Sequence, residues 1–370
     1  MDRIGIYTGV LGFGGIESAV ISQLEKIDHS SLSYDVIIDD AIVNSKNEKR
    51  ILALGDRIQS LEVKSGARFY KLKKYMALYR LIKKNNYRCV HFHFSFPSSL
   101  LYGLVTRMTG TKGIVTSHAS GPARLGVVNK IVQSISRAFY PWLFTNRIAV
   151  SSNAGRWMYG RYSFDVLPNA IDIEKFKYNN EKREEVRKEL GISPGSLVVG
   201  HVGRFVPEKN HSFIIQVFKE VVSKAPDSHL ILVGDGKGKD GVLREVNSNN
   251  LAAQVHIIER TEHVEDYLST MDCFLFPSVR EGFGLVAIEA QANNLPVVAS
   301  DTIPEETRAS ELIQYLSLVD DTSIWTKKIM KSINDEDKRK EPASQLLRSM
   351  YSIDSLATKM KNYYECYTFV

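Results

Sequence analysis

Short apolar segments alternate with helical segments along almost the whole chain, and this alternation is typical of open, mostly parallel α/β sheets. Strands are expected at residues 3–8, 34–39, 89–94, 113–117, 147–151 and 164–167, and then at 197–202, 229–233, 254–258, 273–276 and 297–299. A chain of 370 residues has room for one domain from each series. The expected fold class is therefore α/β, with two doubly wound, Rossmann-like domains whose strand ends face a cleft.

The domain limits follow from a turn and from a change in pattern. Pro168-Asn169 lies between an expected strand and the charged segment 181–189, where a turn between domains fits. We expect an N-terminal domain at 1–172 and a C-terminal domain at 173–343. An amphipathic pattern predicts a last helix at about 344–363, within a C-terminal segment 344–370.

The chain shows no targeting signal. It enters its first expected strand at once, without the basic and apolar pattern of a signal sequence, and it has no run of about 18 apolar residues. Its three cysteines, Cys89, Cys273 and Cys366, are too few for a disulfide framework and lack metal-binding spacing. We therefore expect a cytoplasmic protein.

The net charge of +6 is unevenly distributed. No Asp or Glu occurs between Glu62 and Asp165, whereas 17 Lys or Arg lie in that stretch. Its densest part holds Lys71, Lys73 and Lys74 among aromatic residues, which suits an anionic membrane surface. The alternatives are an ordinary solvated helix face and a nucleic-acid surface; no recognition motif accompanies the charge, so no nucleic-acid partner is expected.

A glycine cluster, Gly12 to Gly15, follows the first expected strand and precedes a helix. Backbone N–H groups in such a loop can approach a phosphate at the helix N-terminus. The cluster also resembles a dinucleotide-binding loop imperfectly, with Asp39 or Asp40 as a ribose-binding acid. A tight turn without a ligand is the third interpretation.

Arg204 and Lys209 follow another expected strand and flank a turn that contains a proline. Two fixed cations at the carboxyl end of a strand suit a diphosphate, whose negative charge rises as its bond to a sugar breaks. A pair of ordinary surface charges is the alternative.

Glu281 precedes the loop Gly282-Phe283-Gly284, and Glu289 lies within the apolar helix that this loop opens. The N-terminus of that helix can hold phosphate. The two carboxylates suit neutral hydroxyl groups, one on a sugar and one on a ribose. An unpaired charge in an apolar helix would be costly, so a binding role explains Glu289 better than a solvated position does.

Taken together, these segments resemble the retaining family 4 glycosyltransferases of the GT-B fold over nearly the whole chain. The segments that carry the resemblance are 14–17, 150–152, 168–172, 203–204, 208–210, 233–236, 281–289, 292 and 296–298. The segment 300–305 further resembles members that build bacterial capsular or exopolysaccharide repeat units. Glu259 and Asn294 depart from the pattern, because each stands where the family usually has Gly.

The resemblance implies a role for each matching residue. Catalytic roles fall to Arg204, Lys209, Glu281 and His118, although a lone histidine after a strand is more often structural. Donor binding falls to Gly15, Phe283, Gly284, Leu285 and Glu289. The last helix would cross back to the N-terminal domain.

The expected function is transfer of a sugar from a nucleotide-sugar, preferably a UDP-sugar, to a polyprenyl-diphosphate-linked saccharide with retention of anomeric configuration. It would serve capsule or exopolysaccharide synthesis at the inner face of the plasma membrane, with Lys71, Lys73 and Lys74 toward acceptor and membrane. No metal and no other cofactor is expected, because Asp335 and Asp337 lie in a charged turn and His91 and His93 suit a polar strand end. The alternatives are an NAD-dependent oxidoreductase, a GT-B nucleotide-sugar epimerase, and a non-catalytic saccharide-binding subunit.

Overall fold

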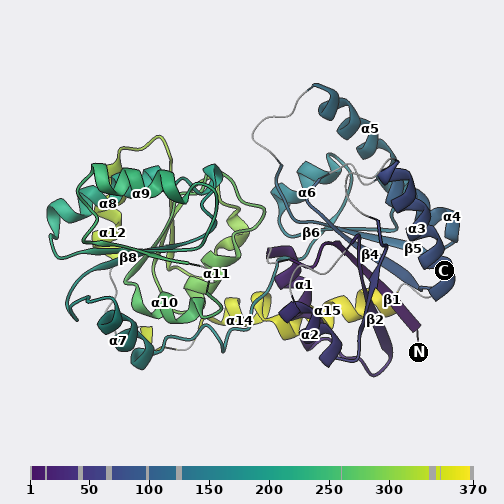
Figure 1. Ribbon diagram of the computed structural model, residues 1–370, viewed down its shortest axis with the longest axis horizontal. Coiled ribbons are helices and arrows are strands. Elements are labelled where there is room, and N and C mark those ends of the chain that lie inside the picture. The colour runs from purple at the N-terminus through teal and green to yellow at the C-terminus, as the bar shows by residue number, and fades with distance from the viewer. Residues whose placement is uncertain are drawn as a thin grey trace. The chain divides into compact units, whose positions relative to one another are not determined.

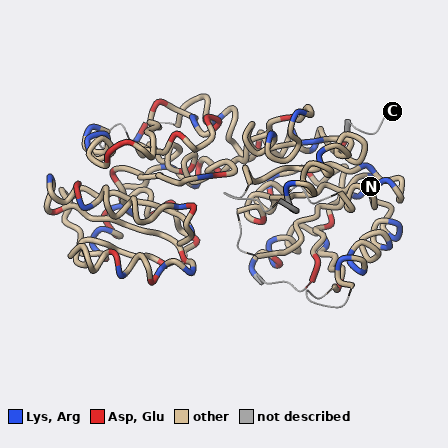
Figure 2. Tube along the Cα trace, turned by 90° about the horizontal axis from the view of Figure 1, so that it is seen from above, with Lys and Arg blue, Asp and Glu red and all other residues tan. Residues whose placement is uncertain are grey.

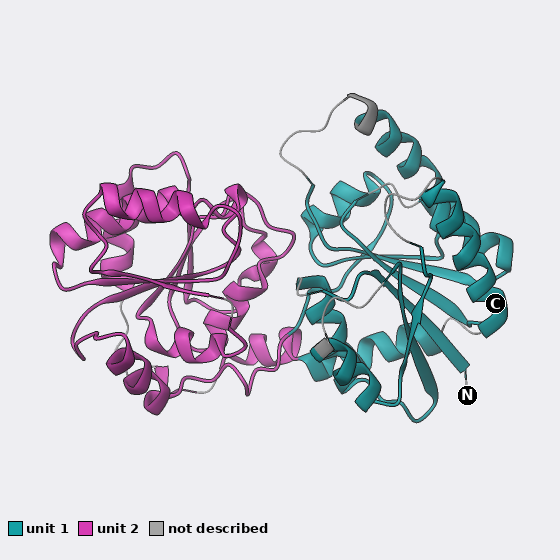
Figure 3. Ribbon diagram, in the orientation of Figure 1, with its two compact units in different colours: residues 1–170, 353–370 teal, residues 171–352 magenta. Residues whose placement is uncertain are grey.

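The structure is a computed structural model that describes residues 2–12, 15–40, 45–63, 69–96, 100–121, 127–259, 261–332, 339–341 and 343–366. It divides into two compact units: unit 1 contains residues 1–170 and 353–370, and unit 2 contains residues 171–352 (Figure 3). The first crossing follows Ala170, two residues before the expected boundary. The second crossing precedes Ile353, so the segment 344–352 belongs to unit 2 rather than to a single last helix.

Unit 1 is built on a seven-stranded sheet in the order β3-β2-β1-β4-β5-β6-β7, and its described strand pairs are all parallel. Its strands are β1 (Asp2–Gly9), β2 (Leu32–Ile38), β3 (Arg57–Ser60), β4 (Cys89–Phe94), β5 (Lys112–Ser117), β6 (Asn146–Ala149) and β7 (Asp165–Val166). Its helices are α1 (Gly15–Lys26), α2 (Ser45–Ala53), α3 (Tyr70–Asn85), α4 (Leu100–Thr109), α5 (Val127–Leu143), α6 (Ser152–Tyr159) and α15 (Ile353–Cys366). Figure 1 shows α1, α2 and α15 on one face of the sheet and α3 to α6 on the other.

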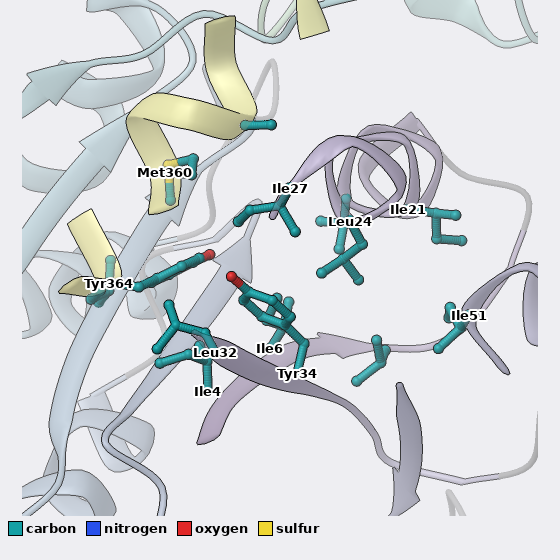
Figure 4. Packing of buried hydrophobic residues seen from close by; sticks show 14 of the residues in the cluster. Ile4, Ile6, Ile21, Leu24, Ile27, Leu32, Tyr34, Ile51, Met360 and Tyr364 are labelled. Carbon is teal, nitrogen blue, oxygen red and sulfur yellow. The ribbon is translucent and has the colours of Figure 1, made fainter. Parts of the chain in front are cut away.

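The C-terminal helix α15 completes the core of unit 1. Its Met360 and Tyr364 are buried against residues of β1, β2 and α1, as Figure 4 shows around Tyr34. The rings of Tyr34 and Tyr364 lie 6.0 Å apart between centroids. Because successive residues of a strand point to opposite faces, His91 of β4 meets α15 whereas Phe92 packs against Tyr102 of α4.

Unit 2 is built on a six-stranded parallel sheet in the order β10-β9-β8-β11-β12-β13. Its strands are β8 (Val198–Val202), β9 (His229–Val233), β10 (Val255–Ile258), β11 (Cys273–Phe276), β12 (Val297–Ser300) and β13 (Ile313–Leu316). Its helices are α7 (Asn180–Glu189), α8 (His211–Lys224), α9 (Lys239–Ser248), α10 (Val264–Thr270), α11 (Leu285–Ala292), α12 (Thr322–Ser332) and α14 (Gln345–Tyr351), with short 3₁₀ helices η1 (Pro207–Lys209) and η2 (Glu305–Thr307). In Figure 1, α8, α9 and α12 cover one face, and α7, α10, α11 and α14 lie on the other.

The expected last helix is broken at Ser352, whose backbone is extended with φ −70° and ψ 131°. At this break Ser352 forms a parallel bridge with Ile171, and the Ile171 N–H donates to the Tyr351 carbonyl at 2.9 Å. The two segments that cross between the units are therefore paired where they enter unit 2. In the part of the chain that the structure describes, no helix is both long and apolar enough to cross a membrane.

Candidate active site

The candidate site of unit 2 lies at the carboxyl ends of β8 and β11, which are neighbours in the sheet. The loops that follow these strands are joined by a hydrogen bond of 2.8 Å from the Val279 N–H to the Glu208 carbonyl. A second bond joins the Asn210 side-chain amide to the Pro277 carbonyl at 3.3 Å. Residues about 70 positions apart in the sequence thereby face each other.

Lys209 and Glu281 meet in this place, with Lys209 Nζ 2.6 Å from Glu281 Oε1. The side chains are only 17% and 14% exposed, so the pair is poorly screened by solvent. The ammonium also lies 5.3 Å from the centroid of the Phe276 ring. Glu281 thus holds the Lys209 cation at the strand ends, where an anionic ligand would meet it.

Arg204 lies on the same loop as Lys209 but is exposed. Its guanidinium makes no ion pair with any residue that the structure describes. The loop itself is anchored, because the Phe205 N–H donates to the Asp235 carbonyl at 2.8 Å and the buried Phe205 ring stacks on His211 with 4.5 Å between centroids. Arg204 is therefore a cation on a fixed backbone with its charge directed to solvent.

Glycines let two loops approach each other behind Arg204. Gly236 has φ +149°, and a Cβ there would lie 2.7 Å from the Phe205 carbonyl oxygen. A side chain at this position would push the Arg204 loop away. The segment 233–236 of the family resemblance therefore has a structural role in unit 2.

The N-terminus of α11 supplies the expected anion site. Gly284 precedes it with φ +94°, a conformation that favours glycine, and Leu285 is its first residue. The first N–H groups of a helix have no acceptor within it, so those of α11 can donate to a ligand. The Phe283 side chain is 3% exposed and stacks on Tyr351 of α14. Only the backbone of Phe283 is therefore available to bind a nucleotide-sugar.

Glu289 is half-buried in α11, and burial raises the pKa of its carboxyl to about 7. Lys175 lowers this pKa and Glu265 raises it further, so both residues lie near the carboxyl. Lys175 Nζ is 3.4 Å from Glu265 Oε2. Neither Lys175 nor Glu265 was predictable from the sequence, because no motif distinguishes them from other surface charges.

The two departures from the family pattern are accommodated locally. Asn294 has φ +52°, the left-handed conformation that Gly would take, and its side-chain amide donates to the Glu341 carbonyl at 2.6 Å. The Glu259 side chain is 81% exposed and binds Lys239 at 2.8 Å. Neither residue disturbs the strands beside it.

His118 lies in unit 1 at the end of β5, next to the end of β4. Its Nε2 is 2.9 Å from Nδ1 of His93, and its own Nδ1 is buried without a hydrogen-bond partner among the described residues. Both ring nitrogens of His91 are hydrogen-bonded: Nδ1 lies 2.8 Å from the Tyr364 hydroxyl, and Nε2 lies 2.7 Å from the Thr116 hydroxyl. Burial lowers the pKa of His91 to about 3 and that of His118 to about 4, so both are neutral at pH 7.

These histidines line a cavity of about 20 Å³, which is roughly the space of one water molecule. Gln23 and Asn169 also face it, so the cavity is polar enough to hold one. No three His, Cys, Asp or Glu side chains gather as a metal site within the described ranges. Asp335 and Asp337 lie outside those ranges.

Gly15 is the first residue of α1 and is exposed, and a Cβ there would meet no atom within 4 Å. Gly14 lies outside the described residues. Asp39, one of the two acids of the dinucleotide interpretation, accepts from the Tyr7 hydroxyl at 2.6 Å and from the Tyr70 hydroxyl at 3.2 Å. Its carboxylate is thus engaged within unit 1, which disfavours a ribose-binding role.

Lys74 differs from Lys71 and Lys73, the other two lysines predicted to face the acceptor and the membrane. Lys74 Nζ lies 3.1 Å from Asp39 Oδ2, and its side chain is only 12% exposed. It also lies over the rings of Tyr70 and Tyr102. Lys71 and Lys73 lie on the same helix and are exposed, so they remain available to a partner.

Comparisons with known proteins agree with this architecture. A model of glycosyltransferase family 4 matches residues 14–175, and one of group 1 glycosyl transferases matches residues 182–345. The putative glycosyltransferase EpsF of Bacillus subtilis is 29% identical over 86% of this chain and 84% of its own length. An Escherichia coli UDP-Gal:alpha-D-GlcNAc-diphosphoundecaprenol alpha-1,3-galactosyltransferase is 28% identical over 62% of each chain.

Among solved structures, Anabaena HepE in complex with UDP-glucose superimposes with a TM-score of 0.81 over 98% of this chain and 99% of its own, at 16% identity. Sucrose-phosphate synthase from Thermosynechococcus elongatus gives a TM-score of 0.78 at 17% identity, covering 99% of both chains. At such identity the likeness concerns the fold, which is GT-B. With two parallel α/β units, and with consecutive family models matching nearly all of it, the chain belongs to the family 4, group 1 glycosyltransferases.

Proposed function

We propose that this glycosyltransferase moves a sugar from a UDP-sugar to a lipid-linked saccharide, with retention of anomeric configuration, in the synthesis of a bacterial capsule or exopolysaccharide. The observation that carries the proposal is the Lys209–Glu281 pair at the strand ends of unit 2. Relatives support the donor and the acceptor: HepE binds UDP and UDP-glucose, and the Escherichia coli relative is named for a UDP-sugar and a diphosphoundecaprenol-linked acceptor.

In the proposed reaction, the donor diphosphate lies against Arg204, Lys209 and the N-terminus of α11. These groups are positive where negative charge develops as the bond between sugar and diphosphate breaks. Glu281 restrains the Lys209 ammonium through its hydrogen bond. We propose that this charge replaces a metal ion and that the acceptor attacks from the face the diphosphate leaves.

The remaining contacts to the nucleotide-sugar are proposed from the place that each residue has in its own unit. Glu289 would accept hydrogen bonds from the ribose hydroxyls, and such bonds favour its ionised form. Gly15, Gly284 and Leu285 would contribute backbone N–H groups, as would Phe283. His118, neutral at pH 7, would lie beside the donor sugar, with its ring oriented by the bond between its Nε2 and His93.

The acceptor would bind unit 1, whose stretch between Glu62 and Asp165 contains no acid. Lys71 and Lys73 would face the anionic headgroups at the inner face of the plasma membrane. Exposed cations of this kind gain about 1 kcal/mol each near such a surface.

The deciding experiment is calorimetric titration of the full chain with UDP in excess EDTA, with GDP and NAD as parallel ligands. Selective binding of UDP without metal supports the proposal. Preference for GDP would change the donor, and binding of NAD alone would overturn the reaction class. An assay with UDP-sugars and lipid-linked saccharides follows, and release of free sugar or an epimer without acceptor would indicate an epimerase.

A further inference from the structure

Helix α5 exposes a row of large apolar side chains on the surface of unit 1. Ile131, Ile135, Phe139 and Trp142 are spaced four, four and three residues apart, which places them along one side of the helix. They are 56%, 50%, 48% and 54% exposed. The other side of α5 is packed, since Ser136, Tyr140 and Leu143 are buried.

Helix α4 packs against α5 and carries a second row of exposed apolar side chains. Leu101, Leu104 and Met108 follow helical spacing and are 46%, 37% and 63% exposed. We call these seven residues the α4–α5 apolar surface: Leu101, Leu104, Met108, Ile131, Ile135, Phe139 and Trp142. Single exposed apolar residues are common, but rows along two neighbouring helices indicate an interaction surface.

The charge around this surface has one sign. Between Glu62 and Asp165 the chain has no acid, and Figure 2 shows Lys and Arg (blue) along the helices of this unit. Near the end of the row the Arg107 guanidinium lies 5.0 Å from the Trp142 ring centroid, and its Nε donates to the Trp142 carbonyl at 2.7 Å. A hollow of about 490 Å³ beside them is lined by Arg107, Lys112 and Trp142.

An anionic phospholipid bilayer matches all of these features. Apolar helical faces insert at the boundary of headgroups and acyl chains, cations beside them contact lipid phosphates, and Trp prefers the interface itself. An acidic protein partner would match the charge, but it leaves the aliphatic rows of Leu, Ile and Met unexplained. We propose that unit 1 inserts the α4–α5 apolar surface into an anionic bilayer, with Trp142 at headgroup level.

The proposal rests on the proposed function in one respect, namely that the acceptor is carried by a membrane. It differs from the expectation for Lys71 and Lys73, because adsorption through exposed lysines is screened by salt whereas apolar insertion is not.

The test measures binding of the full chain to vesicles of phosphatidylcholine with roughly a third of phosphatidylglycerol. Brominated acyl chains should quench Trp142 fluorescence, and Trp142→Phe should remove that quenching. Trp325 is fully buried in unit 2 and serves as an internal reference. Ile135→Glu should lower the partition coefficient at least about five-fold. Its matched control is Ile324→Glu, which changes an isoleucine of unit 2 that is 46% exposed and should leave binding unchanged.

Binding that persists in roughly 0.5 M salt and quenches Trp142 supports insertion. Binding that disappears in that salt, or that leaves Trp142 unquenched, would overturn insertion while leaving transfer activity intact. A chain that does not bind these vesicles at low or high salt would likewise overturn insertion. UDP titration separates the two proposals, because Ile135→Glu should bind UDP normally even where it fails to bind vesicles.

Discussion

The Nδ1 atom of His93 lies 2.9 Å from the Nε2 atom of His118, at the carboxyl ends of two neighbouring strands of unit 1. This bond occupies Nε2 of His118, and Nδ1 of the same ring is buried without a hydrogen-bond partner among the described residues. The orientation of His118 therefore depends on His93, whose sequence pattern predicts only a polar strand end.

His93→Val should lower kcat by roughly ten-fold while leaving the affinity for UDP unchanged, because it frees the His118 ring without touching the nucleotide site. Steady-state kinetics and UDP titration measure the two quantities. His93→Asn, whose amide can replace the Nδ1 hydrogen bond, should recover most of the activity. Equal loss in both variants would indicate that His93 acts only through packing.

Lys209→Ala should lower turnover by about 100-fold or more, because it removes the least exposed cation beside the departing diphosphate and leaves Glu281 there as an uncompensated negative charge. The thermal unfolding midpoint should be compared in parallel to show that the variant is folded. Lys219→Ala changes an exposed lysine of α8 and is the matched control. Near-normal turnover of Lys209→Ala would remove this residue from the site.

UDP affinity should fall as the pH is lowered from 8 to 6. Burial raises the pKa of Glu289 to about 7, and ribose hydroxyls bind the ionised carboxylate, so protonation competes with UDP. Below that pKa the dissociation constant should rise by up to about ten-fold per pH unit. Calorimetry across this range measures the effect, and Glu289→Gln should bind weakly with little pH dependence.

The same carboxyl should affect stability in a defined direction. Its pKa in the folded chain is raised above the ordinary value of 4.5, so its contribution to stability is fully present below pH 4.5 and is lost as the pH rises through about 7. Glu289→Gln should therefore unfold at a higher temperature than the natural chain at pH 8, and this advantage should shrink toward pH 5. An advantage that is constant with pH would contradict the raised pKa.

Lys74→Ala should leave vesicle binding unchanged and destabilise unit 1, because it leaves Asp39 largely buried without its cation. The loss in the free energy of unfolding should be about 1 to 3 kcal/mol, measured by urea denaturation. Lys71→Ala and Lys73→Ala together should do the opposite, weakening binding to anionic vesicles at low salt with little effect on stability.

Most strands were predictable because buried parallel strands are short, apolar and bounded by turns. The edge strands β3 (Arg57–Ser60) and β13 (Ile313–Leu316) were missed. β3 is made of Arg, Ile, Gln and Ser with no buried residue, so it carries no apolar signal. The break at Ser352 was also missed, because it depends on pairing with Ile171, which is distant in sequence.

For the candidate site, the cations and carboxylates of unit 2 were recognisable because they follow strands or open a helix. The sequence did not reveal which of them touch. Lys209 pairs with Glu281 across neighbouring loops, and the burial of Lys74 by Asp39 and Tyr102 depends on the packing of β2, α3 and α4. Both relationships arise from contacts between segments that are distant along the chain.

The place of α15 in the unit 1 core has a consequence for synthesis on the ribosome. Met360 and Tyr364 are synthesised long after the strands β1 and β2 and the helix α1 against which they pack. Unit 2 is a continuous segment, so it can finish folding while the ends of unit 1 are still apart. Until α15 has been synthesised, the core of unit 1 remains incomplete, and a ribosome that stalls before α15 releases a chain in which unit 1 is incomplete although unit 2 can already be folded.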